Sequence, residues 1–198
     1  MTGVRQDLRR RLHGVAFGQA GYFTAAQAKD VGYSHQAQKY HVDHGNWLRV
    51  DRGLFRLPEW PSAADDSYAR WSVWSKGRGV VSHDSALVVH DLSDASPARI
   101  HLTVPDTFHA TDDAVVLHRA ALSDREVEQR EGFRVTDLER TLVDVAGADV
   151  SQEIVDGAIA DAVERGQTSP RRLRRRADGA SDLANLRIER ALATLAEQ

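Results

Sequence analysis

Apolar residues near the start of the chain recur every three or four positions, the spacing of helices that bury one face. This spacing predicts a first helix over residues 4–18. Two shorter helices follow, with Thr24 and Ser34 as side-chain caps at their starts and Gly32 as the turn between them. The second of these two helices is expected to end at Gly45.

A two-stranded pattern comes directly after these helices. Residues 47–50 and 54–57 read as short strands on either side of Asp51-Arg52-Gly53, which is a hairpin signal. The order of helix, glycine turn, helix and hairpin is that of a winged helix-turn-helix, whose second helix enters the DNA major groove. We therefore expect a DNA-binding domain over residues 1–60.

The remaining residues, 61–198, mix helix and strand patterns. Pro58 and Pro61 interrupt the hairpin and mark the expected domain boundary. The predicted fold class is α+β, a winged helix-turn-helix followed by an α/β domain with a small mixed sheet and packed helices. Strands are expected at 100–104, 115–118, 126–130 and 133–135, and helices are expected to begin at Asp65, Ser82, Thr136, Ser151, Ser169 and Asp182.

The outer face of the second short helix carries residues that we expect to contact DNA. Helical geometry turns Ala37 and His41 toward the other helices, which leaves polar side chains outside. Glutamine reads adenine, lysine reaches guanine or phosphate, and tyrosine commonly contacts phosphate. Arginines of the hairpin can bind phosphate or enter the minor groove. The predicted DNA-binding residues are Ser34, His35, Gln36, Lys39, Tyr40, Arg49, Arg52 and Arg56.

The distribution of charge agrees with this division of the chain. Residues 1–60 carry nine Lys and Arg against five Asp and Glu, whereas residues 61–198 carry 17 against 24. A basic front and an acidic back suit a nucleic-acid module joined to a domain of another kind. Two alternatives to DNA contact stay open. The second short helix only packs against the second domain, and the hairpin tip is polar simply because it is exposed.

Other features of the sequence restrict the class of protein. The chain has no cysteine, so it has neither disulfides nor thiolate metal sites. No apolar run approaches the ~20 residues of a membrane span, and the arginine-rich start lacks the apolar run of a signal peptide. We expect a cytoplasmic protein without membrane contact.

The sequence offers no supported catalytic, cofactor or metal site. It contains no nucleophile elbow, phosphate-binding loop or zinc-protease motif. His83 and His90 lie two helical turns apart, but nothing fixes a carboxylate beside them, so a capping or packing role is favoured for His83. Thr136 and Glu139 are three residues apart at a predicted helix start, which indicates a capping box rather than catalysis. We therefore expect no enzyme and no cofactor.

The densest basic run lies in the acidic half, over residues 171–176. Five of these six residues are arginines. They are expected either to form a solvated helix face or to touch nucleic acid or an acidic partner.

Three blocks of sequence together resemble the AbiEi-type antitoxins of bacterial abortive-infection, type IV toxin–antitoxin systems. The first block runs from Gly21 to Leu57 and includes Gly21-Tyr22-Phe23-Thr24 and Gly53-Leu54-Phe55-Arg56-Leu57. The second is Ser82-His83-Asp84-Ser85-Ala86-Leu87, and the third is Thr136-Asp137-Leu138-Glu139-Arg140-Thr141-Leu142-Val143-Asp144. The resemblance covers most of residues 20–165.

This resemblance implies a function with two parts. The first domain would repress its own promoter by binding inverted repeats, and the second would oppose a nucleotidyltransferase toxin encoded by the adjacent gene. Two other functions fit the same first domain: a stand-alone winged-helix transcriptional regulator, or a protein-interaction module whose DNA-binding domain is vestigial.

Overall fold

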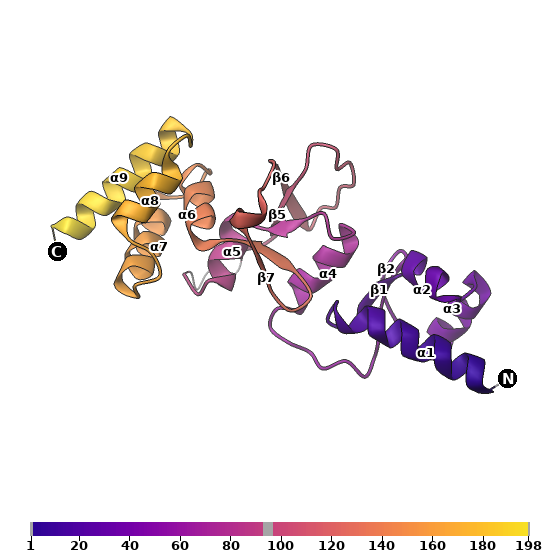
Figure 1. Ribbon diagram of the computed structural model, residues 1–198. Helices are drawn as coiled ribbons and strands as arrows, with labels where there is room; N and C mark the ends of the chain where they lie inside the picture. The colour runs from indigo at the N-terminus through magenta and orange to yellow at the C-terminus, as the bar shows by residue number, and fades with distance from the viewer. Residues whose placement is uncertain (1, 93–96, 198) are drawn as a thin grey trace. The chain divides into compact units, whose positions relative to one another are not determined.

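The structure is a computed structural model that describes residues 2–92 and 97–197 (Figure 1). The chain forms two compact units. The first consists of residues 1–79 together with 130–133, and the second consists of residues 80–129 together with 134–198. Among the described residues, no helix is both long and apolar enough to cross a membrane.

The first unit has the element order of a winged helix-turn-helix. Its three strands form an antiparallel sheet in the order β1-β3-β2. The predicted helices and hairpin are confirmed, while the short strand β1 was not predicted. The elements are α1 (Thr2–Phe17), β1 (Tyr22–Thr24), α2 (Ala25–Val31), α3 (His35–Asp43), β2 (Leu48–Asp51), β3 (Leu54–Arg56) and α4 (Asp66–Trp74).

Side-chain caps define the two short helices, as the sequence predicts. Thr24 Oγ1 accepts a hydrogen bond from the Gln27 amide at 3.1 Å, and the Gln27 side chain accepts one from the Thr24 amide at 2.8 Å. Ser34 Oγ accepts from the Ala37 amide at 3.2 Å. Gly32 between the helices has a φ of +122°, and a Cβ there would lie 2.9 Å from Leu8. The turn therefore requires glycine for its conformation, and Leu8 would have to shift to make room for a larger residue.

The small sheet of the first unit is covered on both faces. Because side chains alternate along a strand, Phe23 and Phe55 face the core that α1 to α3 build. Tyr22 and Leu54 face the opposite side and pack against α4. This second layer extends the first compact unit to Gly79, beyond the boundary that we expected at residue 60.

The second unit is a mixed five-stranded sheet with helices packed on it, as the sequence predicts. The strand order is β6-β5-β4-β8-β7. Strand β4 pairs antiparallel with β5 and parallel with β8. The strands are β4 (Val80–Val81), β5 (Ile100–Val104), β6 (Val115–Arg119), β7 (Val127–Gln129) and β8 (Arg134–Thr136), and only β4 was not predicted.

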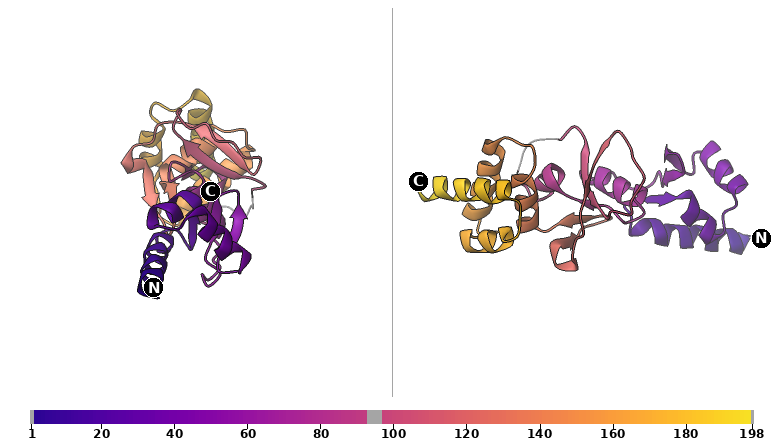
Figure 2. Two further views of the ribbon diagram at one scale, coloured as in Figure 1. Left: turned by 90° about the vertical axis from the view of Figure 1, so that its right-hand side faces the viewer. Right: turned by 90° about the horizontal axis from the view of Figure 1, so that it is seen from above.

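The helices of the second unit share one apolar core. Leu142, Ile159, Leu173 and Ile188 are fully buried in it and come from four different helices. Figure 2 shows these four helices, in orange to yellow, lying side by side, in agreement with their contacts. The helices are α5 (His83–Val89), α6 (Leu138–Ala146), α7 (Gln152–Glu164), α8 (Pro170–Ala177) and α9 (Asp182–Ala196), with a 3₁₀ turn η1 (Asp124–Glu126) before β7.

The capping box expected at Thr136 and Glu139 is wrong. The residue that caps α6 is Asp137, whose side chain accepts from the Arg140 amide at 2.8 Å. Thr136 ends strand β8 and is buried, so its hydroxyl bonds that of Thr141 at 2.7 Å. Glu139 is thereby free to pair with another helix.

Candidate nucleic-acid interface

The outer face of α3 presents the residues that the sequence predicts to contact DNA. Ser34, His35, Gln36, Lys39 and Tyr40 are all exposed, and the side chain of Tyr40 is 55% exposed. The prediction that these residues point outward is confirmed.

The inner face of α3 is fixed to the rest of the unit by polar and ring contacts. Gln38, buried at 4% exposure, donates from Nε2 to the carbonyls of Ala25 and Tyr33, both at 3.1 Å. The ring of His41 stacks on Trp47 with centroids 4.8 Å apart. Sequence reasoning missed Gln38, because a glutamine in a polar helix gives no sign of burial.

Two side chains on the outer face already have partners on α3 or at its C-cap. Lys39 Nζ lies 2.6 Å from Asp43 Oδ2, in an exposed ion pair. The Tyr40 ring stacks on His44 with centroids 3.9 Å apart. Exposed pairs of this kind contribute little, so Lys39 can exchange Asp43 for a phosphate at small cost.

The hairpin between β2 and β3 supplies two further exposed cations. Arg49 and Arg52 are both exposed, with Arg52 at the tip, where its amide donates to Asp51 Oδ1 at 2.6 Å. The Gly53 carbonyl accepts from the Ala25 amide at 2.8 Å, which joins the tip of the hairpin to the start of α2. The hairpin and the helix pair are thus held as one surface.

Arg56 does not belong to this surface. It lies on the sheet face that packs against α4, and its side chain is only 13% exposed. Its Nη2 donates to Asp66 Oδ2 at 2.6 Å and to the Pro61 carbonyl at 3.0 Å. The guanidinium also lies 5.0 Å from the centre of the Tyr22 ring. The geometry makes Arg56 a structural residue of the first unit rather than a DNA contact.

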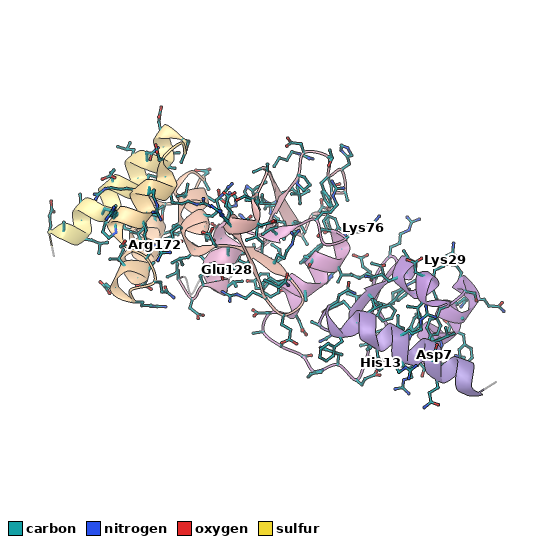
Figure 3. The ribbon with its side chains drawn as sticks, in the orientation of Figure 1. Asp7, His13, Lys29, Lys76, Glu128 and Arg172 are labelled. Atoms are coloured by element: carbon teal, nitrogen blue, oxygen red, sulfur yellow. The ribbon has the colours of Figure 1, made fainter. Side chains whose placement is uncertain are left out.

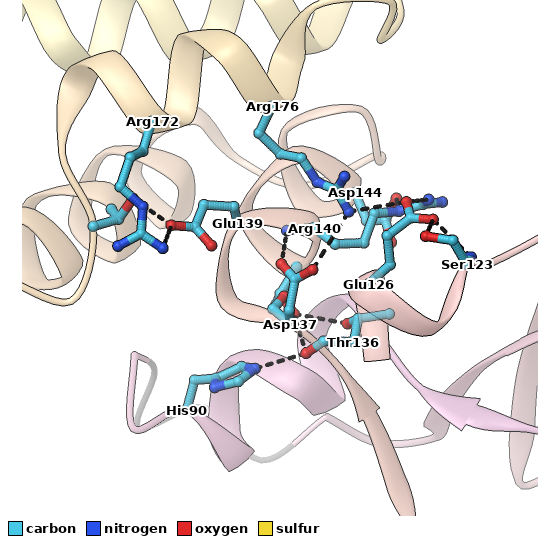
Figure 4. A network of polar contacts seen from close by, with 12 residues as sticks. His90, Ser123, Glu126, Thr136, Asp137, Glu139, Arg140, Asp144, Arg172 and Arg176 are labelled. Carbon is cyan, nitrogen blue, oxygen red and sulfur yellow. Dashed lines mark hydrogen bonds and ion pairs between the residues drawn. The ribbon is translucent and has the colours of Figure 1, made fainter. Parts of the chain in front are cut away.

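The arginine run on α8 is largely neutralised inside the second unit. Arg172 pairs with Glu139 at 2.6 Å, and Arg174 makes two contacts with Glu189, at 2.8 and 3.0 Å. Figure 3 locates Arg172 on this helix, and Figure 4 shows its ion pair. Arg176 reaches the acidic residues before α6. The run therefore links α8 to α6 and α9.

The second and third sequence blocks come together in the fold, where His83 of the second and Arg140 and Asp144 of the third line one cavity. A network of charged side chains lies around Arg140 (Figure 4). Arg140 donates to Glu126 at 2.7 Å and to Asp144 at 2.8 Å, and Arg176 donates to the same Glu126 oxygen at 2.9 Å. Burial alone would raise the pKa of Glu126, but hydrogen bonds from Ser123 and Arg140 lower it to about 2.

His83, from the second block, starts α5 in an unusual environment. Its φ of +52° is rare for a residue with a side chain. Its ring stacks on His118 with centroids 3.4 Å apart, and His118 Nε2 lies 3.2 Å from His101 Nδ1. Burial and His118 lower the pKa of His83 to about 3, and burial and His101 lower that of His118 to about 4. Both rings are therefore neutral at pH 7.

His83 and His90 do not converge on a common site. His90 is buried and donates from Nε2 to the Thr136 carbonyl at 2.8 Å, which ties α5 to the end of β8. Within residues 2–92 and 97–197, no group of three or more His, Asp or Glu side chains is arranged to hold a metal ion. His83 stacks on His118, in line with the packing role that the sequence favoured for it, and His90 has a packing role that the sequence did not assign.

Comparisons with known proteins show a likeness in fold. No protein-family model matches the chain, and no curated protein matches it. A solved structure, the RV2827C protein from Mycobacterium tuberculosis, superposes with a TM-score of 0.64 at 17% sequence identity. The match covers 94% of this chain and 76% of that one. At this identity the likeness shows that the α+β fold is shared with that mycobacterial protein.

Proposed function

We propose that the protein is a cytoplasmic DNA-binding transcriptional regulator, and specifically the autorepressing antitoxin of a type IV toxin–antitoxin pair. The observation that carries the DNA-binding part is the exposed polar face of α3 beside the exposed arginines of the hairpin. A winged helix-turn-helix uses these two elements to contact a major groove and the flanking backbone or minor groove.

The chemistry of this face suits contact with a duplex. Gln36 is available for base reading, while Lys39, Arg49 and Arg52 can each neutralise a phosphate. Because Arg56 is occupied by Asp66, the proposed contact set is Ser34, His35, Gln36, Lys39, Tyr40, Arg49 and Arg52. The antitoxin part, opposing a nucleotidyltransferase toxin, rests on the three sequence blocks that resemble AbiEi-type antitoxins.

A gel shift on the DNA upstream of the protein's own gene tests the proposal. The expected result is a specific complex that resists random competitor DNA and weakens steeply as salt rises, because each phosphate contact releases counterions. Co-expression with the product of the adjacent gene then tests the antitoxin part. DNA binding without relief of toxicity would leave a stand-alone regulator.

One observation favours a second candidate, a protein-interaction module. Tyr40 and Leu48 are 55% and 47% exposed, and both belong to the part of the first unit that would meet DNA. Exposed apolar side chains are more typical of protein contacts. Binding that random competitor DNA removes as readily as specific DNA would favour this candidate and contradict the proposed regulator.

A further inference from the structure

Helix α9 of the second unit, yellow in Figure 1, leaves apolar side chains in solvent. Its inner face packs into the core through Ile188 and Leu192. On the opposite face, Leu186 is 69% exposed and Leu183 is 45% exposed. Among the large apolar side chains of the described residues, only Phe17 in the first unit is more exposed than Leu186. Removing apolar surface from water is favourable, so contact with a second surface here would be stabilising.

The two flanks of this exposed face are attached to neighbouring parts of the second unit. On one flank, Glu189 accepts from Arg174 of α8 at 2.8 and 3.0 Å. On the other, Arg187 Nη1 donates to the carbonyl of Ala148, just after α6, at 2.8 Å. Because both flanks of the helix turn toward its own unit, the face between them points away from that unit.

Two charged residues of α9 stand at equal distances on either side of Leu186. Asp182 precedes it by four residues, and Arg190 follows it by four. Both side chains are exposed, and within the described residues neither has an ion-pair partner. The two positions are separated by about 12 Å along the helix axis, which is too far for them to pair with each other.

A twofold axis beside Leu186 would match these two charges. In an antiparallel pair of identical helices related by such an axis, the residue four before Leu186 lies level with the residue four after it. Asp182 of one copy then meets Arg190 of the other, and the same ion pair forms a second time across the axis. Four residues turn a helix by about 400°, so both charged residues point within about 40° of the direction of Leu186.

We propose that the exposed face of α9 is the contact between two copies of this chain, which pair antiparallel about Leu186. Leu183 and Leu186 of both copies form its apolar centre, and two Asp182–Arg190 pairs flank it. A parallel pair would bring like charges together, and a uniformly acidic or basic partner would oppose one of the two charges. A second copy satisfies both.

The size of this contact predicts a weak dimer. A single helix face buries less surface than a standard protein interface, so we expect a dissociation constant in the micromolar range. The proposal concerns the second unit alone and does not depend on DNA binding by the first.

Sedimentation equilibrium of the full-length protein, up to several hundred micromolar, tests the proposal. The expected result is a reversible monomer–dimer equilibrium. Leu186→Ser puts a polar side chain at the centre of the contact and should weaken the dimer about ten-fold or more. Ile154→Ser changes an apolar side chain that is 40% exposed but lies on α7, so it is a matched control that should leave the equilibrium unchanged.

Two charge reversals test the antiparallel arrangement. Asp182→Arg and Arg190→Asp each place like charges opposite one another, and each should weaken the dimer about ten-fold. An equimolar mixture of the two variants restores opposite charges at both ion pairs, so a mixed dimer should form about as tightly as the dimer of the unchanged protein. Far-UV circular dichroism of each variant checks that α9 remains helical.

Three results would each overturn the proposal. The first is a protein that stays monomeric at every concentration. The second is a Leu186→Ser variant that dimerises as tightly as Ile154→Ser. The third is a mixture of the two charge variants that dimerises no better than either variant alone.

Discussion

Two regions of the molecule that carry basic residues differ in what those residues contact. The α3 and hairpin surface holds few cations for its size, yet Arg49 and Arg52 extend freely into solvent. Helix α8 carries the densest arginine run in the chain, yet Arg172, Arg174 and Arg176 each hold a carboxylate from another segment. The density of basic residues along the sequence therefore gives a poor measure of positive surface.

The difference arises from where the acidic partners lie. Glu126 lies 50 residues from Arg176, Glu139 lies 33 from Arg172, and Glu189 lies 15 from Arg174. No local spacing in the sequence indicates these pairs. Among the described residues of the first surface, Lys39 alone has an ion-pair partner, and that partner, Asp43, is one helical turn away. The contrast teaches that the folded environment decides whether an arginine builds structure or meets a ligand.

The largest effect is expected from a substitution that breaks the charged network of the second unit. Arg140→Ala removes the donor shared by Glu126 and Asp144. It takes the ion-pair partner from the largely buried Asp144 and leaves Glu126 with Arg176 and Ser123. The free energy of unfolding of the second unit should fall by about 3 kcal/mol. All four tryptophans lie in the first unit, so the loss should show in far-UV circular dichroism while the tryptophan fluorescence transition stays in place. Coincident shifts in both signals would contradict this.

The next effect concerns pH and the histidines of the second unit. In the folded protein His83 and His118 have pKa values near 3 and 4, below the ordinary value of 6.5. Between those folded values and pH 6.5, the unfolded chain therefore binds more protons than the folded chain. Stability is fully present above pH 6.5 and is lost as pH falls toward 4. Partial solvent exposure reduces the slope, to about 1 kcal/mol per pH unit for each ring. His118→Asn should flatten the profile, measured by denaturation at each pH.

A smaller effect is expected on the α3 and hairpin surface. Lys39→Ala and Arg52→Ala should each weaken promoter binding by about ten-fold and reduce the slope of log affinity against log salt by about one. Lys29→Ala and Lys76→Ala, both in the first unit and labelled in Figure 3, remove the same charge elsewhere and serve as matched controls. Equal losses in all four variants would point to nonspecific attraction.

The smallest effect is expected on α8. Arg171 and Arg175 are exposed and, within the described residues, have no ion-pair partner. Their replacement by alanine should change promoter affinity less than about two-fold and stability by less than about 0.5 kcal/mol. A loss comparable to that of Arg52→Ala would show that α8 contacts DNA and would remove the contrast between the two regions.

Local signals in the sequence predicted much of the fold. Thr24, Ser34 and Gly32 act through neighbours within four residues, so the boundaries of α2 and α3 could be read directly. Strands β1 and β4 have three and two residues, too few to show alternation. They exist because partners far along the chain, β3 and β5, complete their hydrogen bonding.

Residues of the candidate site were predicted correctly when their exposure followed from the geometry of one helix. They were predicted wrongly when their exposure depended on packing between elements. The outward direction of His35, Gln36 and Lys39 follows from the spacing of a single helix. Arg56 was misplaced for the same reason as the domain boundary: α4 covers the second face of the sheet, and no local pattern shows this. The capping role of Asp137 was missed because Thr136, beside it, offers an equally suitable side chain.

The two hydrogen bonds from buried Gln38 have a thermodynamic consequence. In the free protein they fix α3 to the start of α2 and to the turn between the two helices. This helix therefore does not need to become ordered when the protein binds a partner. Binding to a duplex would then bury surface without coupled folding, and the heat-capacity change should be no larger than the contact area requires. If the surface binds DNA as proposed, the conformational cost of binding then falls mainly on the deformation of the DNA.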